Sequence, residues 1–225
     1  TIAGFVLLKQ RDYVSAGGAG ALMSATRSTG LLFAGAILIA AFQNHLRDGG
    51  SVRGFFRTLW KRTDLLLAVA LVPVGICLFA IYLWFHSGDA LAFVHIQRAW
   101  GRAFSDPFRN LWLTLKMQFD AHNYSTISTD LAFGLAAIAG MALSGVMAWK
   151  GKWDWALFSL FGVLLPLSTN AYSMLRFVVG LAPVLITASL LFSRWKWLFY
   201  LLLPALLILD VLLLPTWTGR SYYLM

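Results

Sequence analysis

Arg27 is the residue whose position in the sequence points most directly to chemistry. It lies within residues 16–42, which are apolar apart from Ser24 and the polar run at 26–29. At 1.5 Å per residue, a helix that starts near Ser15 would carry Arg27 roughly 18 Å into a hydrocarbon core about 30 Å thick. An ionisable group at that depth costs several kcal/mol unless it is paired or hydrated, so such a residue is a candidate for function. A guanidinium suits a phosphate, which it can hold with two parallel hydrogen bonds.

Arg176 is the second candidate for binding an anion near the predicted outer face. It follows Asn170, Tyr172 and Ser173 at the entrance to an apolar stretch. We predict that Arg27 and Arg176 bind phosphate together. Each arginine also has a structural alternative. Arg27 could pair with Asp210 or with unwound backbone carbonyl groups, and Arg176 could extend its side chain to the membrane interface.

Residues 86–130 form the one long polar segment and supply the other candidates. His95, Gln97 and Trp100 could line a sugar site, because an aromatic face and amide groups suit a pyranose. The same three side chains could instead face lipid head groups. Asp89 follows Gly88 directly before an amphipathic stretch, so it could cap a helix as well as bind substrate. We predict Asp89, His95, Gln97 and Trp100 as substrate-binding residues.

No metal or cofactor site is predicted. The histidine and aspartate residues of the polar segment show no HxH or HExxH spacing, and the single cysteine, Cys77, lies in an apolar run. The sequence contains no Ser-His-Asp arrangement, no glycine-rich phosphate loop and no dinucleotide fingerprint. An internal disulfide is excluded because there is only one cysteine.

The composition excludes a soluble domain. Hydrophobic residues make up 60% of the 225 residues and charged residues only 12%, about half the usual share of charge. The apolar residues form blocks long enough to span a bilayer. The net charge of +9 comes mostly from basic residues in short connectors, where they orient helices and contact lipid head groups. We therefore expect membrane lipids and no nucleic acid among the partners.

Hydropathy and charge together predict a topology. Clear spans are expected at 65–85, 131–149, 177–192 and 197–214, with a shorter one at 155–167 that continues past Pro166. The basic connectors 43–64, 150–154 and 194–196 should be cytoplasmic. Alternation then places 86–130, 168–176 and the tail after Pro215 on the outer side.

Residues 16–42 do not fit simple alternation. The basic residues on both sides of this stretch look cytoplasmic, yet 27 residues are too few for two full spans. We predict a re-entrant helical hairpin with its turn at 26–30, whose first half packs closely through small residues. The alternative is one long tilted helix, which would leave Lys9 and Arg11 outside.

Two polar segments have the pattern of helices that lie on the membrane. Arg53, Arg57 and Lys61 share one face of an inner-leaflet helix, opposite Phe55 and its apolar neighbours. On the outer side, aromatic and aliphatic residues recur at helical spacing from Phe93 to Phe104. The predicted fold is all-α: a polytopic transmembrane helix bundle with a re-entrant helical hairpin and outer-face amphipathic helices. We treat residues 1–225 as one transmembrane domain, the C-terminal part of a longer chain, because 2–8 reads like the end of a membrane helix.

Three motifs resemble a known family when taken in order. They are Ser24-Ala25-Thr26-Arg27-Ser28-Thr29-Gly30, then Gly88-Asp89-Ala90-Leu91-Ala92-Phe93-Val94-His95-Ile96-Gln97 with Trp100, then Ser173-Met174-Leu175-Arg176-Phe177 with Pro183. The set resembles the Thr-Arg-x-x-Gly, Gly-Asp-x-x-Ala-Phe-x-x-x-Gln and Arg-Tyr elements of the PIG-V-like membrane mannosyltransferases, in the GT-C glycosyltransferase superfamily. Phe177 stands where that family has Tyr.

The resemblance implies an enzyme that moves a hexose, mannose, from a polyprenyl-phosphate donor to an acceptor glycan or glycolipid at the outer face. Arg27 and Arg176 would then bind the donor phosphate. Such folds place the catalytic Asp in the first outer loop, which would precede Thr1, so the catalytic residue is unknown and this chain alone should be inactive. The rival classes are a secondary transporter and a non-catalytic membrane subunit. We expect a multi-pass protein of the bacterial plasma membrane in preference to the endoplasmic reticulum.

Overall fold

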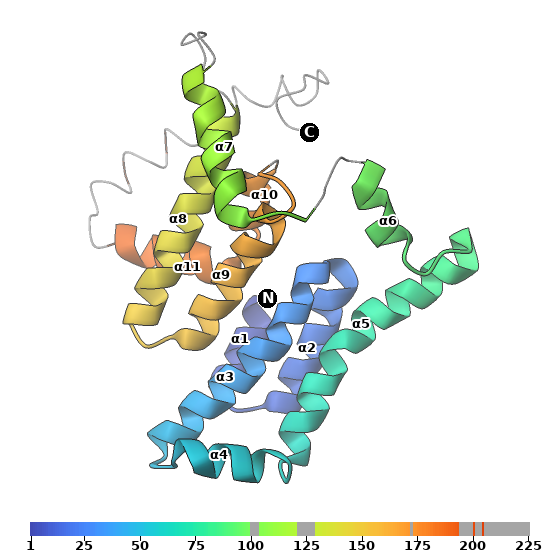
Figure 1. The fold of residues 1–225 in the computed structure, drawn as a ribbon. Helices are drawn as coiled ribbons and strands as arrows, with labels where there is room; N and C mark the ends of the chain where they lie inside the picture. The colour runs from blue at the N-terminus through green and yellow to red at the C-terminus, as the bar shows by residue number, and fades with distance from the viewer. Residues whose placement is uncertain (100–103, 121–128, 172, 194–199, 201–203, 205–225) are drawn as a thin grey trace.

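The described part of the chain is helical and contains no strand, as the all-α prediction requires (Figure 1). The computed structural model describes residues 1–99, 104–120, 129–171, 173–193, 200 and 204. The elements in chain order are α1 (Ile2–Lys9), α2 (Tyr13–Thr26), η1 (Ser28–Leu31), α3 (Leu32–Arg47), α4 (Val52–Leu59), α5 (Thr63–Ser87), α6 (Ala92–Ala99), α7 (Pro107–Asp120), α8 (Thr129–Trp149), α9 (Trp153–Leu167), α10 (Met174–Val179) and α11 (Ala182–Phe192).

Three helical segments of the described chain are long and apolar enough to cross a membrane. They are Ser28–Arg47, Thr63–Ser87 and Leu131–Trp149, and the last two coincide with spans expected from hydropathy. Helices α9 and α11 are apolar but shorter. The predicted span at 197–214 lies outside the described residues. By length and composition, the chain is compatible with a membrane protein.

Proline residues lie near the ends of two predicted spans, and one of these spans is divided into two helices. The predicted span 177–192 is divided into α10 and α11 at Gly180 and Leu181, because Pro183 cannot donate a backbone hydrogen bond from a helix interior and instead lies in the first turn of α11. Helix α9 includes Pro166 and ends one residue later at Leu167, which is the boundary expected for this span. There, the hydroxyl groups of Ser168 and Thr169 donate to carbonyl groups of the last turn.

Small residues bring α2 and α5 into close contact. A Cβ atom added at Gly17 would lie 2.5 Å from the carbonyl oxygen of Ala68, and one added at Gly75 would lie 1.8 Å from that of Ala21. Only glycine allows two helix backbones to approach this closely. The expectation that the first half of residues 16–42 packs through small residues is therefore confirmed.

Ser24 of α2 bonds to the backbone of α5. Its buried hydroxyl donates to the carbonyl oxygen of Val72 and accepts from the backbone N–H of Ile76. In a regular helix these two backbone groups bond to each other. Pro73 lies in the same turn and already removes one donor. Ser24 thus connects α2 to the turn of α5 that contains Pro73.

An aromatic cluster at the centre connects α1–α5 to the helices that follow α6. The ring of Phe5 lies 5.2 Å from that of Phe33 and 5.3 Å from that of Phe158, centroid to centroid, both edge to face. Trp155 completes the cluster at 5.5 Å from Phe5. Such pairs contribute about 0.5–1.5 kcal/mol each beyond the area that they bury.

Hydrogen bonds between distant connectors define the two ends of the bundle. The Gln43 side chain donates to the Gly151 carbonyl group at 2.6 Å, so the connectors 43–64 and 150–154 lie at one end, here called the basic end. At the opposite end, the Asn110 side chain donates to the Leu167 carbonyl group at 2.8 Å, and Ser105 N–H donates to Ser168 O at 2.7 Å. We call this the loop end. In Figure 1, α4 lies at the basic end, and α6 and α7 lie toward the loop end.

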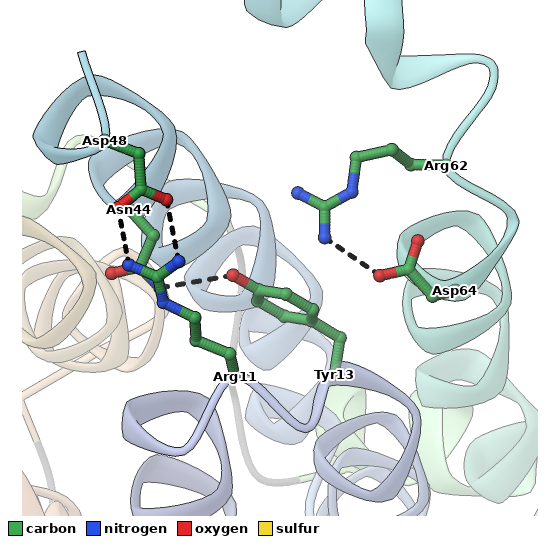
Figure 2. Close-up of polar contacts among 6 residues, drawn as sticks. All are labelled: Arg11, Tyr13, Asn44, Asp48, Arg62 and Asp64. Carbon is green, nitrogen blue, oxygen red and sulfur yellow. Dashed lines mark hydrogen bonds and ion pairs between the residues drawn. The ribbon is translucent and has the colours of Figure 1, made fainter. Parts of the chain in front are cut away.

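Polar pairs connect the helix ends at the basic end (Figure 2). Arg11 contacts Asp48, and the Asn44 side chain donates to the hydroxyl of Tyr13 at 3.1 Å. The guanidinium of Arg62 lies over the Tyr13 ring, 5.0 Å from its centroid, and donates to Asp64 at 2.8 Å. These contacts hold the starts of α2 and α5 beside the end of α3.

Candidate functional site

The turn that carries Arg27 is built by a break in the helix. Helix α2 ends at Thr26, Arg27 has extended backbone angles (φ −150°, ψ 133°), and η1 starts at Ser28. Gly30 permits the tight return, because a Cβ atom there would lie 2.4 Å from backbone atoms of Met23 and Ser24. The chain therefore does not form one uninterrupted helix through Arg27.

Arg27 and Arg176 both lie near one aromatic ring, that of Phe177. The guanidinium carbon of Arg27 is 4.9 Å from the centroid of Phe177, and that of Arg176 is 5.8 Å from the same centroid. The two guanidinium carbons therefore cannot be farther apart than the sum of these distances. Arg27 and Arg176, which are 149 positions apart in the sequence, therefore lie near each other at the loop end.

Arg27 also fits against the backbone of α10. A Cβ atom added at Gly180 would lie 2.6 Å from its Nη1 atom. Gly180 follows α10 directly, and the left-handed backbone of Ser173 (φ 66°) starts that helix. Both arginines are exposed in the described part of the chain, so together with Phe177 they form an open basic surface rather than an enclosed cavity.

Asp89 and His95 form a separate cluster after α5. One carboxylate oxygen of Asp89 accepts from the Leu91 N–H at 2.9 Å, and the other lies 2.7 Å from Nδ1 of His95. These hydrogen bonds, of which the one with His95 is the strongest, hold the pKa of Asp89 below its usual value. Asp89 therefore orders the start of α6 and positions His95 at the same time.

The remaining predicted substrate residues are only partly described. The Gln97 side chain donates to the Phe93 carbonyl group of its own helix at 3.4 Å. Trp100 lies outside the described residues. Phe93 packs against Phe79, with centroids 5.9 Å apart, so α6 folds back against the end of α5.

The described structure brings the two arginines together, but it does not bring the cluster of Asp89 and His95, here called the acidic cluster, into contact with them. Within the described residues, Asp89 contacts His95, and no ion pair connects Asp89 to either arginine. In Figure 1, α6 stands at the end of α5, away from α10. No group of three or more His, Cys, Asp or Glu side chains could hold a metal ion in this part of the chain.

Two features of the structure were missed from the sequence. One is the contact of Arg27 with Gly180, and the other is a cavity at the basic end whose rim uses the connector residues Lys9, Arg47 and Lys152. The basic connectors were visible in the sequence, but their charges were interpreted only as topology signals. No protein-family model, curated protein or solved structure matches this chain.

Proposed function

We propose that this chain is part of an integral membrane glycosyltransferase that moves a hexose, mannose, from a polyprenyl-phosphate donor to an acceptor glycan or glycolipid at the outer face. The observation that carries the proposal is the approach of Arg27 and Arg176 to the same Phe177 ring at the loop end. Two exposed cations beside an aromatic surface suit a ligand that combines a phosphate with an apolar chain.

The chemistry of the proposed reaction explains why two cations are useful. As the glycosidic bond breaks, the carrier phosphate gains negative charge. Cations already held in place stabilise that charge without having to reorganise, and they do so better where water is scarce. The tight turn at Gly30 fixes the backbone of Arg27, and the Phe177 ring limits the positions of both guanidinium groups.

The acidic cluster would serve the sugar side of the reaction. In this proposal His95 and Gln97 bind hydroxyl groups of the substrates, Asp89 holds His95 in one orientation, and Trp100 offers a ring face. The contact of Asp89 with His95 supports the positioning role. No catalytic residue is assigned among the described residues.

The membrane arrangement belongs to the same proposal. We infer a multi-pass protein of the bacterial plasma membrane in which α2, η1 and α3 form a re-entrant hairpin that enters from the basic end. The break at Arg27 and the closure of the hairpin base by Arg11 and Asp48 support this arrangement. Helix α4 would lie on the inner leaflet, with Phe55 buried and Arg53 and Arg57 exposed, and α6 would lie at the outer face.

The test is transfer of labelled mannose from polyprenyl-phosphate-mannose to candidate acceptors by the purified full-length protein. Arg27→Ala should slow transfer by on the order of a hundredfold, the usual cost of losing one charge-stabilising donor. Arg27→Lys should restore only part of the rate, because an ammonium lacks the planar fork. If both variants lose folded protein but keep normal activity per folded molecule, Arg27 has a structural role. If no donor supports transfer, the enzyme proposal is wrong.

A secondary transporter is the second candidate, and the helix break at Arg27 is the observation that favours it. Broken helices and intramembrane arginines are common at the substrate sites of transporters. Uptake of an anionic substrate into proteoliposomes without any group transfer would identify this class. Neither flux nor transfer would indicate a non-catalytic subunit.

A further inference from the structure

A cavity of about 440 Å³ opens among connector residues of the basic end and reaches the start of α11. It is formed between α1, the end of α3, the start of α9 and the start of α11. Its volume is within the range of about 300–1,000 Å³ that is usual for small-molecule sites. The proposed transferase site does not use any of the residues that line it.

The polar part of the cavity lining carries a net positive charge. Lys9, Arg47 and Lys152 supply three cations, whereas Asp154 is the one carboxylate. Among the described residues, none of the three cations forms an ion pair. The ammonium of Lys152 lies 4.4 Å from the centroid of the Trp155 ring, and all three cationic residues are exposed. An anion that enters the cavity would therefore find cations that carboxylates do not already occupy.

The rest of the cavity wall is apolar and is held in shape by the polar contacts of Gln43. The rings of Phe5 and Trp155 and the side chains of Pro183 and Ile186 form this wall. Gln43 donates to the Gly151 carbonyl group and accepts from the Asp154 N–H at 3.4 Å, so it connects α3 to the start of α9. A charged rim above an apolar wall suits an amphiphile rather than a fully polar anion.

The position of the rim matches the head-group level of a bilayer. Arg47 is the last residue of one candidate membrane segment, and Lys152 follows another, which ends at Trp149. Trp149 is 89% exposed and Trp153 is 50% exposed, on either side of Lys152. Exposed tryptophans next to basic residues are typical of the membrane–water interface, and basic pockets between helices bind lipid head groups there.

We propose that this cavity binds the phosphate head group of an anionic lipid from the leaflet at the basic end. Arg47, Lys152 and Lys9 surround the phosphate, and an acyl chain follows the apolar wall beside Phe5 and Pro183. Asp154 weakens the site by repulsion and so limits its affinity. This lipid is separate from the proposed sugar donor, whose phosphate would lie at the loop end.

The experiment measures lipid retention by the full-length protein in detergent by native mass spectrometry. Phosphatidylglycerol should be retained in preference to phosphatidylcholine. Arg47→Gln and Lys152→Gln should each lower the affinity for phosphatidylglycerol about fivefold, the usual effect of one basic residue near an anionic head group. Asp154→Asn keeps the side-chain shape and should raise the affinity, which a purely structural role would not explain.

Arg57→Gln is the matched control, because Arg57 is an exposed arginine of α4 at the same end that does not line the cavity. It should leave lipid retention unchanged. An equal loss in Arg57→Gln would overturn the proposal in favour of general surface attraction. Displacement of the lipid by glycerol 3-phosphate at similar concentration would also overturn it, since the cavity would then take a soluble phosphate ester.

Discussion

Arg11 and Asp48 close the base of the hairpin formed by α2, η1 and α3 with two parallel hydrogen bonds. Nη1 of Arg11 lies 2.7 Å from Oδ2 of Asp48, and Nη2 lies 2.8 Å from Oδ1 (Figure 2). The residues that precede α2 and follow α3 are therefore neighbours, although 37 positions separate them. Hence the two ends of the hairpin must lie on the same side of any membrane that the hairpin enters.

This geometry leads to a labelling prediction. In a Cys77→Ser background, single cysteines at Arg53 and Lys152 should react with a membrane-impermeant maleimide from one side, and a cysteine at Arg109 from the other side. Arg53 and Lys152 belong to the basic end, whereas Arg109 belongs to the loop end, next to Asn110. All three residues are exposed, so the labels can reach them. Labelling of Arg53 and Arg109 positions from the same side would contradict the predicted topology.

The Arg11–Asp48 contact should make stability depend on pH at acidic values. The hydrogen bonds from Arg11 hold the pKa of Asp48 below its usual value of about 4. A carboxyl group with a lowered folded pKa stabilises the fold above its unfolded pKa, and that stabilisation is lost as the pH falls through the folded pKa. The wild type should thus have a higher apparent melting temperature than Asp48→Asn at pH 6, with the difference vanishing at strongly acidic pH.

Arg11→Gln is the partner variant for this measurement in detergent. It should lower the melting temperature at pH 6, and its difference in melting temperature from the wild type should also vanish at strongly acidic pH. A difference between wild type and Asp48→Asn that stays constant down to the lowest pH would show that the carboxylate charge is not responsible. Because both side chains are about half exposed, added salt should weaken the effect.

The close packing of α2 on α5 predicts a pair of glycine variants with opposite results. Gly17→Ala should destabilise the protein by about 1–3 kcal/mol, because the new methyl group meets backbone atoms of Ala68 that cannot move aside. Gly18→Ala should be neutral or slightly stabilising, since a Cβ atom there meets nothing within 4 Å and alanine favours the helix. Denaturant unfolding in detergent compares the two. Equal effects would mean that α2 and α5 do not pack as described.

Gly180 offers a test of the proposed phosphate site that does not alter either arginine. Gly180→Ala should move the Arg27 guanidinium, because the added methyl group would lie 2.6 Å from its Nη1 atom. The end of a long side chain can shift at little cost, so the melting temperature should stay almost unchanged. If Arg27 binds the donor phosphate, the rate of mannose transfer should fall several-fold.

Gly145→Ala is the control for this variant, because a Cβ atom at Gly145 of α8 meets nothing within 4 Å. It should leave both stability and transfer unchanged. Full transfer activity in Gly180→Ala would show that Arg27 does not bind the donor phosphate. Loss of folded protein would mean that the Arg27 side chain cannot move.

The parts of the fold that hydropathy could predict are those in which one apolar run makes one helix. Helices α5 and α8 were found for that reason. Helix α7 was missed because it lies in a polar segment, although its start carries a recognisable signal: Pro107 is its first residue, and the Asp106 carboxylate accepts from the Phe108 N–H. Its apolar face becomes evident only once Leu115 packs over Gly134 of α8.

The candidate site also has features that the local sequence predicts and features that depend on tertiary packing. Arg27 and Arg176 stood out because each is a charged residue beside apolar sequence, and that signal is local. The distance between the two arginine side chains depends on how α10 packs against its neighbours, which no local sequence pattern encodes. The contact of Arg27 with Gly180 depends on the same packing. The basic-end cavity is formed by four helices that are distant in the sequence. Their positions in the chain therefore could not show that Lys9 and Lys152 line the same cavity.

The bonding of Ser24 to the backbone of α5 has a mechanical consequence. Because the Ser24 hydroxyl bonds to backbone groups of Val72 and Ile76, on either side of Pro73, a change in the bend of α5 at Pro73 should shift Ser24. Arg27 follows Ser24 by three residues, and Asp89 follows the distal end of α5. Helices α2 and α5 are therefore coupled at Ser24. A tilt of the part of α5 that precedes Asp89 and His95 should therefore also displace Arg27.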